Sequence, residues 1–362
     1  MNILVLLTDL YEAVGGIQTF NRCLAQALSE ASSEKRFNIT VHALNDNDKN
    51  IINNENQING INYRGFNKNK LSFALASLNA SLSADIVIFG LINFSPLAIL
   101  MRKHNLKKYL VVYGYEVWER LPFVKLAGVH NMTNILSISD YTKQEMAKHN
   151  NLNEEKFIIF PCTLDPFYAK DMKLLSRAEL SLPEGNLLLT VSRLESTDIY
   201  KNIDLVIKSM PSIIKKIPDF YFVIVGEGSD RKRLEKLAFD LGVSGNIIFT
   251  GRVSDDLLPS YYNLCDVFVL PSLQEGFGIV FLEAMYFSKP CIGARAGAVS
   301  EVVEHNKTGL ICEPSDVESL ADSIICLFEN KPMANKLGQA AKEKLNREFS
   351  FHSFKQRLEN LL

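Results

Sequence analysis

The residues best suited to chemistry lie in one short segment in the second half of the chain. Glu275 and Glu283 are separated by seven residues, and Gly276 and Gly278 stand between them. The apolar run 267–270 just before them predicts a strand, so we expect Glu275 at the carboxyl end of a strand, where ligands of open α/β sheets bind. Carboxylates accept hydrogen bonds from sugar hydroxyls, while glycine amides and the amino end of a helix favour anions. The pattern therefore favours a ligand with both hydroxyls and phosphates.

Two cations follow another predicted strand end. Arg193 and Lys201 come after the apolar run 187–191, and we expect them on the same side of the sheet as Glu275. Preorganised cations at such a position can stabilise negative charge on a bound phosphate, in place of a divalent metal. The alternative is that both are ordinary surface cations.

The sequence around these residues resembles the signature of the large retaining GT-B glycosyltransferase family called GT4. The residues that carry the resemblance are Glu-Gly-Phe-Gly at 275–278, Ser-Arg-Leu at 192–194, Lys201, and Gly-Glu-Gly at 226–228, within a match that covers nearly all of 187–314. The resemblance implies an α/β fold of two Rossmann-like, doubly wound parallel-sheet domains that face a central cleft. It also implies a C-terminal helix that crosses back to the first domain.

The same resemblance implies an activity and a role for each candidate residue. The activity is retaining transfer of a hexose-type sugar from a UDP- or GDP-sugar to a hydroxyl of a sugar or lipid-linked sugar, in bacterial polysaccharide or glycolipid assembly. The catalytic candidates are Glu275, Arg193 and Lys201. The donor-binding candidates are Gly16, Gly276, Phe277, Gly278, Glu283 and Val253. Among these, Glu283 is expected on the ribose and Val253 in the loop beside the base, whereas Gly226 and Gly228 are explained equally well by a plain turn.

The first half of the chain matches the family less closely. Gly15 and Gly16, after the first predicted strand, resemble its phosphate-side glycine loop, although a strand-to-helix turn is the alternative. The family often carries a histidine where this chain has Tyr113, followed by Glu116. Tyrosine can hydrogen-bond a sugar hydroxyl but cannot carry a proton charge near neutral pH. Tyr113 and Glu116 are therefore candidates for an acceptor or sugar contact.

No metal and no other cofactor is expected. Asp46-Asn47-Asp48 imitates the Asp-x-Asp metal motif of the other main glycosyltransferase fold, but it opens the Asn- and Asp-rich segment 45–62, which predicts an exposed loop. The six histidines show no ligand spacing.

Apolar, β-branched runs alternate with amphipathic stretches, which predicts two successive parallel sheets. The predicted strands are 3–7, 39–43, 86–89, 109–113, 135–138 and 157–160 in the first sheet, and 187–191, 221–225, 247–250, 267–270 and 291–294 in the second. The proline-bearing segment 161–185 predicts a linker. The domains are expected at 1–168 and 169–346, and the resemblance implies that 347–362, with the C-terminal crossing helix, completes the first domain.

The composition narrows the class of protein. A chain of 362 residues, 47% of them hydrophobic, exceeds what one core usually holds. A formal net charge of -2, without basic runs interleaved with aromatic residues, argues against nucleic acid as a partner. The six cysteines form no Cys-x-x-Cys pair and are expected to be buried free thiols in a reducing compartment.

The location expected from the sequence is cytoplasmic. The chain opens on a predicted strand rather than a leader, and it has no apolar stretch of the length that spans a bilayer. Lys103, Lys107 and Lys108 recur at helical spacing, which is typical of a solvated face and would also suit peripheral contact with the inner membrane surface.

Two other functions stay open. One is a nucleotide-sugar 2-epimerase on the same fold, which the Glu-Gly-Phe-Gly sequence argues against. The other is a non-catalytic nucleotide-sugar-binding protein, for which Tyr113 in place of histidine is the only support. Release of free sugar and nucleotide from a donor, without acceptor, separates an enzyme from a binder.

Overall fold

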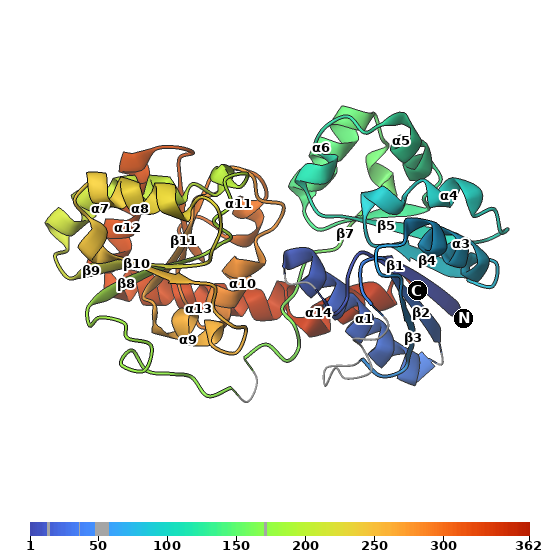
Figure 1. Ribbon diagram of the computed structural model, residues 1–362, viewed down its shortest axis with the longest axis horizontal. Coiled ribbons are helices and arrows are strands. Elements are labelled where there is room, and N and C mark those ends of the chain that lie inside the picture. The colour runs from blue at the N-terminus through green and yellow to red at the C-terminus, as the bar shows by residue number, and fades with distance from the viewer. Residues whose placement is uncertain (13–14, 36, 48–57, 170–171) are drawn as a thin grey trace. The chain divides into compact units, whose positions relative to one another are not determined.

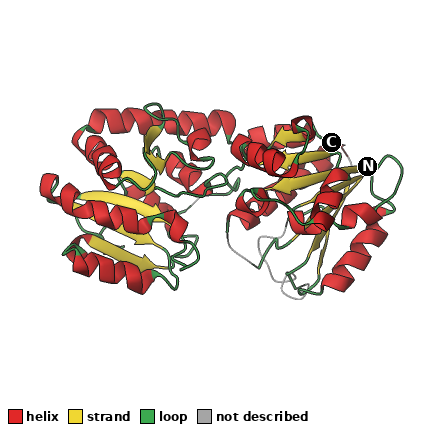
Figure 2. Ribbon diagram, turned by 90° about the horizontal axis from the view of Figure 1, so that it is seen from above, coloured by secondary structure: helices red, strands yellow, loops and turns green. Residues whose placement is uncertain are grey.

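The computed structural model describes residues 1–12, 15–35, 37–47, 58–169 and 172–362. These residues form two compact units: unit 1 consists of 1–166 and 349–362, and unit 2 of 167–348. Each unit is a parallel sheet with helices packed against it (Figures 1 and 2). The chain thus leaves unit 1 after residue 166 and returns to it at residue 349.

Unit 1 contains a seven-stranded parallel sheet in the order β3-β2-β1-β4-β5-β6-β7. Its strands are β1 (Asn2–Leu7), β2 (Asn38–Ala43), β3 (Ile61–Gly65), β4 (Ile86–Phe89), β5 (Lys107–Val112), β6 (Asn134–Ser137) and β7 (Phe157–Ile159). Its helices include α1 (Gly16–Lys35), α3 (Lys70–Ser81), α4 (Leu97–Leu100), α5 (Phe123–His130), α6 (Asp140–Asn150) and α14 (Phe351–Glu359). The strand order reverses between β1 and β4, which makes the carboxyl ends of these two strands the topological switch point of the sheet.

The last helix of the chain belongs to unit 1. Phe354 of α14 packs edge-on against Phe20 of α1 and against Phe160, with ring centroids 5.4 and 4.7 Å away. The hydroxyl of Thr163 donates a 2.7 Å hydrogen bond to the carbonyl of Phe349, just before α14. Apolar burial and this hydrogen bond therefore fix the C-terminal segment to the N-terminal sheet.

Unit 2 contains a six-stranded parallel sheet in the order β10-β9-β8-β11-β12-β13. Its strands are β8 (Asn186–Val191), β9 (Phe220–Val225), β10 (Ile247–Gly251), β11 (Val267–Leu270), β12 (Cys291–Ala294) and β13 (Gly309–Cys312). Its helices include α7 (Ile203–Lys216), α8 (Arg231–Asp240), α9 (Leu258–Leu264), α10 (Ile279–Tyr286), α11 (Val299–Val302), α12 (Val317–Glu329) and α13 (Lys331–Glu348). Figure 1 shows α7, α8 and α12 on one face of the strands and α9 and α13 on the other.

The register of unit 2 places two apolar strands at its centre. Val267 and Phe268 of β11 pair with Leu188 and Leu189 of β8, and all four side chains are buried. The chain runs from β8 outward to β9 and β10, then crosses back to β11 and continues outward on the other side. The switch point of this sheet therefore lies between the carboxyl ends of β8 and β11, where open α/β sheets bind ligands.

Two strands were not among those predicted. β3 carries an arginine and an asparagine and forms the edge of its sheet, so its alternating burial lacks the continuous apolar run of a central strand. β13 is only four residues long, Gly309–Cys312. In both cases the segment is a strand because it pairs with a neighbouring strand. The composition of so short a segment does not predict that pairing.

The expected helical face of Lys103, Lys107 and Lys108 is wrong. Lys107 and Lys108 open β5, and the buried Lys108 ammonium donates a 2.9 Å hydrogen bond to the carbonyl of Ala98. The ammonium of Lys103 donates to the carbonyl of Ala84 and pairs with Asp85. Membrane contact thus loses the lysine face on which it was based.

The cysteines follow the expectation with one exception. Five are buried free thiols, whereas Cys326 is exposed on α12. No helix in the described part of the chain has both the length and the apolar character needed to cross a bilayer.

Asp46, the first residue of the rejected metal motif, anchors the segment after β1. One of its carboxylate oxygens accepts hydrogen bonds from the amides of Leu10 and Tyr11 and from the hydroxyl of Tyr63, at 2.7 to 3.0 Å. The other accepts a longer bond, 3.4 Å, from the amide of Glu12. The Asp46 side chain is fully buried, so this carboxylate serves the backbone of unit 1. Asp48 lies outside the described residues.

We predict that Asp46→Ala lowers the free energy of unfolding by about 3 kcal/mol, because it leaves several buried donors without an acceptor. Tyr63→Phe removes one of these hydrogen bonds and should cost only about 1 kcal/mol. Urea unfolding of both variants measures the difference. An Asp46→Ala variant as stable as the wild type, or a wild type that Mn²⁺ stabilises through Asp46, would contradict this assignment.

Candidate functional site

Arg193, Lys201 and Glu275 come together at the switch point of unit 2. Arg193 follows β8, Lys201 ends the single turn Ile199–Lys201 before α7, and Glu275 lies in the loop that leaves β11. Hydrogen bonds join the two loops: the amide of Leu273 and the hydroxyl of Ser272 donate to the carbonyl of Tyr200 at 2.8 and 3.3 Å, and the Asn202 side chain donates to the carbonyl of Pro271 at 3.1 Å.

The ammonium of Lys201 forms an ion pair with Glu275. Its Nζ lies 2.6 Å from Oε2 of Glu275, and the two side chains are only 18% and 14% exposed. Lys201 is therefore not the ordinary surface cation that the alternative interpretation describes. Half-buried partners are screened less than surface ions, so removing one leaves the other uncompensated.

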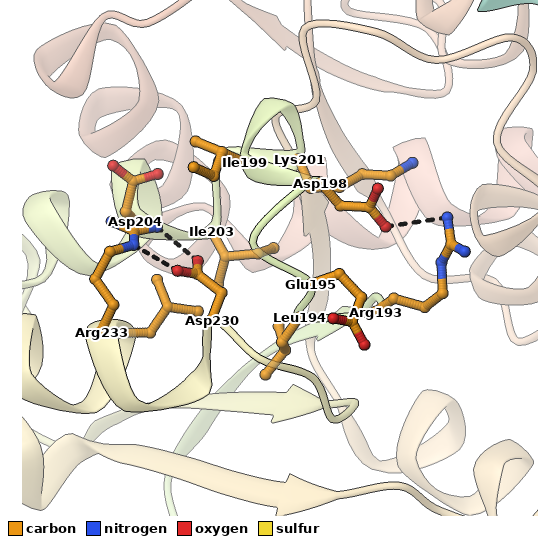
Figure 3. Close-up of a pocket in the computed structure, with 11 residues that line it drawn as sticks. Arg193, Leu194, Glu195, Asp198, Ile199, Lys201, Ile203, Asp204, Asp230 and Arg233 are labelled. Atoms are coloured by element: carbon orange, nitrogen blue, oxygen red, sulfur yellow. Dashed lines mark hydrogen bonds and ion pairs between the residues drawn. The ribbon is translucent and has the colours of Figure 1, made fainter.

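Arg193 has a different environment. Its guanidinium lies 3.0 Å from the carboxylate of Asp198, and the two side chains point toward each other in Figure 3. The Arg193 side chain is 74% exposed, whereas Asp198 is 11% exposed and accepts a 3.2 Å hydrogen bond from the hydroxyl of Tyr200. Arg193 is thus a largely solvated cation beside a well-held carboxylate.

The backbone around Glu275 is shaped by glycine. Gly278, at φ 90°, has the left-handed conformation that starts α10, and the side chain of Phe277 is buried in the core. Gly297 packs so closely that a Cβ there would lie 2.6 Å from the carbonyl oxygen of Glu275. Within the described residues, the amides of Gly276 and Gly278 make no hydrogen bond, so these two donors remain available.

Glu283 is a half-buried residue of α10 whose carboxylate has a partner in the fold. Its Oε2 accepts a 2.6 Å hydrogen bond from the hydroxyl of Tyr262, on α9. Burial raises the pKa of Glu283 to about 7, the Tyr262 hydrogen bond opposes that rise, and the charge of Asp255 adds to it. Its neighbour Tyr168 has a buried hydroxyl without a hydrogen-bond partner in the described part of the chain. Burial, followed by the charge of Glu283, raises the pKa of Tyr168.

The two glycines of the β9–α8 turn have a steric role. A Cβ on Gly226 would lie 1.8 Å from the carbonyl oxygen of Ser192, and one on Gly228 would lie 2.3 Å from the backbone of Leu194. These contacts allow the turn to pack directly against the loop that carries Arg193. The turn interpretation of this pair therefore has a physical basis. Val253 is partly exposed in the loop after β10.

In unit 1, Gly15 and Gly16 are exposed at the start of α1, after β1. Tyr113 was expected to offer its hydroxyl to a sugar, but the ring is buried and the hydroxyl lies 3.3 Å from the side-chain oxygen of Asn21. The carboxylate of Glu116 accepts a 2.6 Å hydrogen bond from the amide of Tyr113, and burial raises its pKa. Both side chains are therefore used inside unit 1, while the role of Gly16 stays a prediction.

Sequence reasoning missed Tyr262, Asp198 and Tyr200. Tyr262 is 21 residues from Glu283, and no periodic pattern connects the two. Asp198 could have been noticed, because it stands between Arg193 and Lys201. A carboxylate between two candidate phosphate ligands favours an ion pair with one of them.

The fold and the site together define a GT-B glycosyltransferase. The model of the family described as "Glycosyl transferases group 1" matches residues 171–344. A GDP-mannose-dependent alpha-(1-6)-phosphatidylinositol monomannoside mannosyltransferase of Mycobacterium tuberculosis is 30% identical over 287 residues, which cover 74% of this chain and 73% of the relative. The chain therefore belongs to the group 1 glycosyltransferase family.

Solved structures share the fold over the whole chain. A crystal structure of Anabaena Alr3699/HepE in complex with UDP aligns with a TM-score of 0.82 at 18% identity, covering 100% of this chain and 99% of that chain. Sucrose-phosphate synthase from Thermosynechococcus elongatus aligns with a TM-score of 0.79 at 19% identity, covering 100% and 98%. At these identities the likeness establishes the fold alone.

We predict that Glu283 makes stability depend on pH. The unfolded chain releases this proton near the usual 4.5 and the folded protein near 7, so the folded state binds more protons between these values. Stability should therefore fall as the pH rises through this window, by at most about 3 kcal/mol. Glu283→Gln should remove this part of the slope in urea unfolding from pH 5 to 8.

Tyr262→Phe is the matched variant for this measurement. It deletes the hydrogen bond that lowers the pKa of Glu283, so the loss of stability should move to higher pH. Equal slopes in all three proteins would mean that Glu283 is ionised throughout the range.

Proposed function

We propose that this chain is a retaining glycosyltransferase that moves a hexose-type sugar from a UDP- or GDP-sugar to a hydroxyl of a sugar or lipid-linked sugar acceptor. The observation that carries the proposal is the convergence of Arg193, Lys201 and Glu275 at the switch point of unit 2. The GDP-mannose dependence of the mycobacterial relative and the UDP in the Anabaena structure support a nucleotide-sugar donor.

Lys201 and Arg193 bind the diphosphate of the donor in this proposal. The Lys201 ammonium has three donors, so it can hold a phosphate oxygen while it keeps Glu275. The guanidinium of Arg193 offers a planar, bidentate arrangement suited to phosphate. Because both cations stabilise the charge that grows on the leaving group, we propose that the enzyme needs no divalent metal and no other cofactor.

The donor sugar lies against the loop that follows β11. Glu275 accepts hydrogen bonds from sugar hydroxyls, and the amides of Gly276, Phe277 and Gly278 face the same ligand at the start of α10. Glu283 binds the ribose through the oxygen that Tyr262 leaves free, and Val253 lies beside the base.

The transfer step retains configuration. The bond from the anomeric carbon to the phosphate oxygen breaks, and its electron pair goes to the phosphate. The acceptor hydroxyl oxygen forms the new bond on the same face, and its proton passes to the departing phosphate oxygen. The carboxylate of Glu275 stabilises the positive charge that develops on the sugar during this exchange.

The proposed acceptor is a glycolipid or a polysaccharide precursor. The mycobacterial relative is a phosphatidylinositol monomannoside mannosyltransferase, which supports a role in bacterial glycolipid or polysaccharide assembly. We propose a cytoplasmic protein that reaches lipid-linked acceptors at the inner membrane surface.

The test is a donor assay with UDP- and GDP-sugars, in which free sugar and nucleotide are measured with EDTA present and no acceptor. We expect slow hydrolysis of one donor. Glu275→Gln loses a contact that strengthens in the transition state, so turnover should fall by about 10²-fold. Glu283→Gln removes a uniform binding contact and should mainly raise the donor KM.

Three outcomes contradict the proposal in different ways. Donor binding without turnover in any assay, with or without acceptor, indicates a non-catalytic binding protein. Formation of an epimeric sugar indicates the 2-epimerase. Activity that EDTA abolishes and Mg²⁺ or Mn²⁺ restores contradicts the metal-free mechanism.

A further inference from the structure

The loop between β8 and α7 carries a carboxylate between its two cations. Asp198 lies five residues after Arg193 and three before Lys201. The ammonium of Lys201 pairs with Glu275, whereas the carboxylate of Asp198 pairs with the guanidinium of Arg193 (Figure 3). A negative charge at this position lies beside the place where the diphosphate of the donor is expected.

The geometry holds Asp198 more firmly than Arg193. Oδ1 of Asp198 accepts a hydrogen bond from the Tyr200 hydroxyl, and the amide of Asp198 donates to the carbonyl of Glu195 at 2.8 Å. Oδ2 is buried and lies 3.0 Å from the Arg193 guanidinium, yet it makes no aligned hydrogen bond in the described part of the chain. The contact is therefore a close but poorly directed ion pair.

A diphosphate would compete well for this arginine. Pairs with an exposed member are worth about 1 kcal/mol or less. Aligned, bidentate hydrogen bonds between arginine and phosphate are stronger, because both groups are charged and their geometries match. Most of the Arg193 side chain is in solvent, so it can turn from Asp198 to a phosphate without disrupting the fold.

We propose that Asp198 is a competing counter-ion for Arg193: it holds the guanidinium when the site is empty and weakens the hold of the site on the nucleoside diphosphate product. The inference rests on the proposed function, because the competing ligand is the diphosphate of a nucleotide sugar. Asp198 thereby favours product release, and it acts on the ligand only through Arg193 and through its own charge.

The test compares Asp198→Asn with Asp204→Asn in the full chain. Both substitutions remove one negative charge from the same pocket, but Asp204 pairs with Lys208, at 2.7 Å. Calorimetry and surface plasmon resonance with UDP and GDP give the affinity and the release rate. Asp198→Asn should tighten diphosphate binding about fivefold and slow its release, since about 1 kcal/mol of competition is removed. Asp204→Asn should change neither by more than about twofold.

Further variants keep the result decisive. Asp198→Ala should reproduce the gain if the asparagine folds poorly in thermal melting. In the Arg193→Gln background, Asp198→Asn should give a clearly smaller gain than in the wild type, because most of the effect acts through the guanidinium.

Weaker or unchanged diphosphate binding by folded Asp198 variants overturns the inference. Weaker binding would show that Asp198 orients Arg193 for the ligand, and unchanged binding would show that it has no effect on the ligand. An equal gain in Asp204→Asn also overturns it, because the effect is then general. If the wild type binds neither UDP nor GDP, the proposed function fails, and the inference fails with it.

Discussion

The ion pair between Lys201 and Glu275 is the interaction on which the candidate site depends. Each residue comes from a different side of the switch point, and their side chains meet at 2.6 Å in a position that is mostly shielded from water. Removing one partner of such a pair destabilises the fold, because the other charge is then left desolvated and uncompensated. The pair holds a carboxylate and an ammonium, the groups proposed to bind sugar hydroxyls and phosphates, at adjacent positions.

Close backbone packing makes this pair possible. Gly297 brings one backbone directly against Glu275, and Gly226 and Gly228 bring the β9–α8 turn directly against the loop of Arg193. A side chain at any of these three positions would collide with backbone, which cannot move aside as a flexible side chain can. Gly226, Gly228 and Gly297 therefore act by allowing neighbouring loops to pack backbone against backbone.

Much of the fold can be predicted from the sequence, because short apolar runs mark the central strands. The central strands β8 and β11 are continuous apolar segments, and their order along the chain, with Arg193 and Glu275 after them, predicts which side chains share an edge. The Glu275 pairing itself, the Tyr262 partner of Glu283 and the anchoring of the first loop by Asp46 could not be predicted. Each joins residues distant in the chain, and hydrogen bonds of this kind leave no periodic trace. The burial of Tyr113 could not be predicted either. This tyrosine stands where the family often carries a histidine, but its ring is buried and its hydroxyl donates a hydrogen bond to the Asn21 side chain.

Whether Lys201, at the switch point of unit 2, binds the diphosphate of a nucleotide can be measured by isothermal titration. UDP and GDP are titrated into the wild type and into Lys201→Met, with thermal melting to confirm folding. We predict that the wild type binds at least one of these nucleotides and that the folded variant binds it about 10²-fold less tightly, because it loses a buried, charge-assisted contact. Equal affinity in the two proteins would mean that Lys201 does not bind the diphosphate.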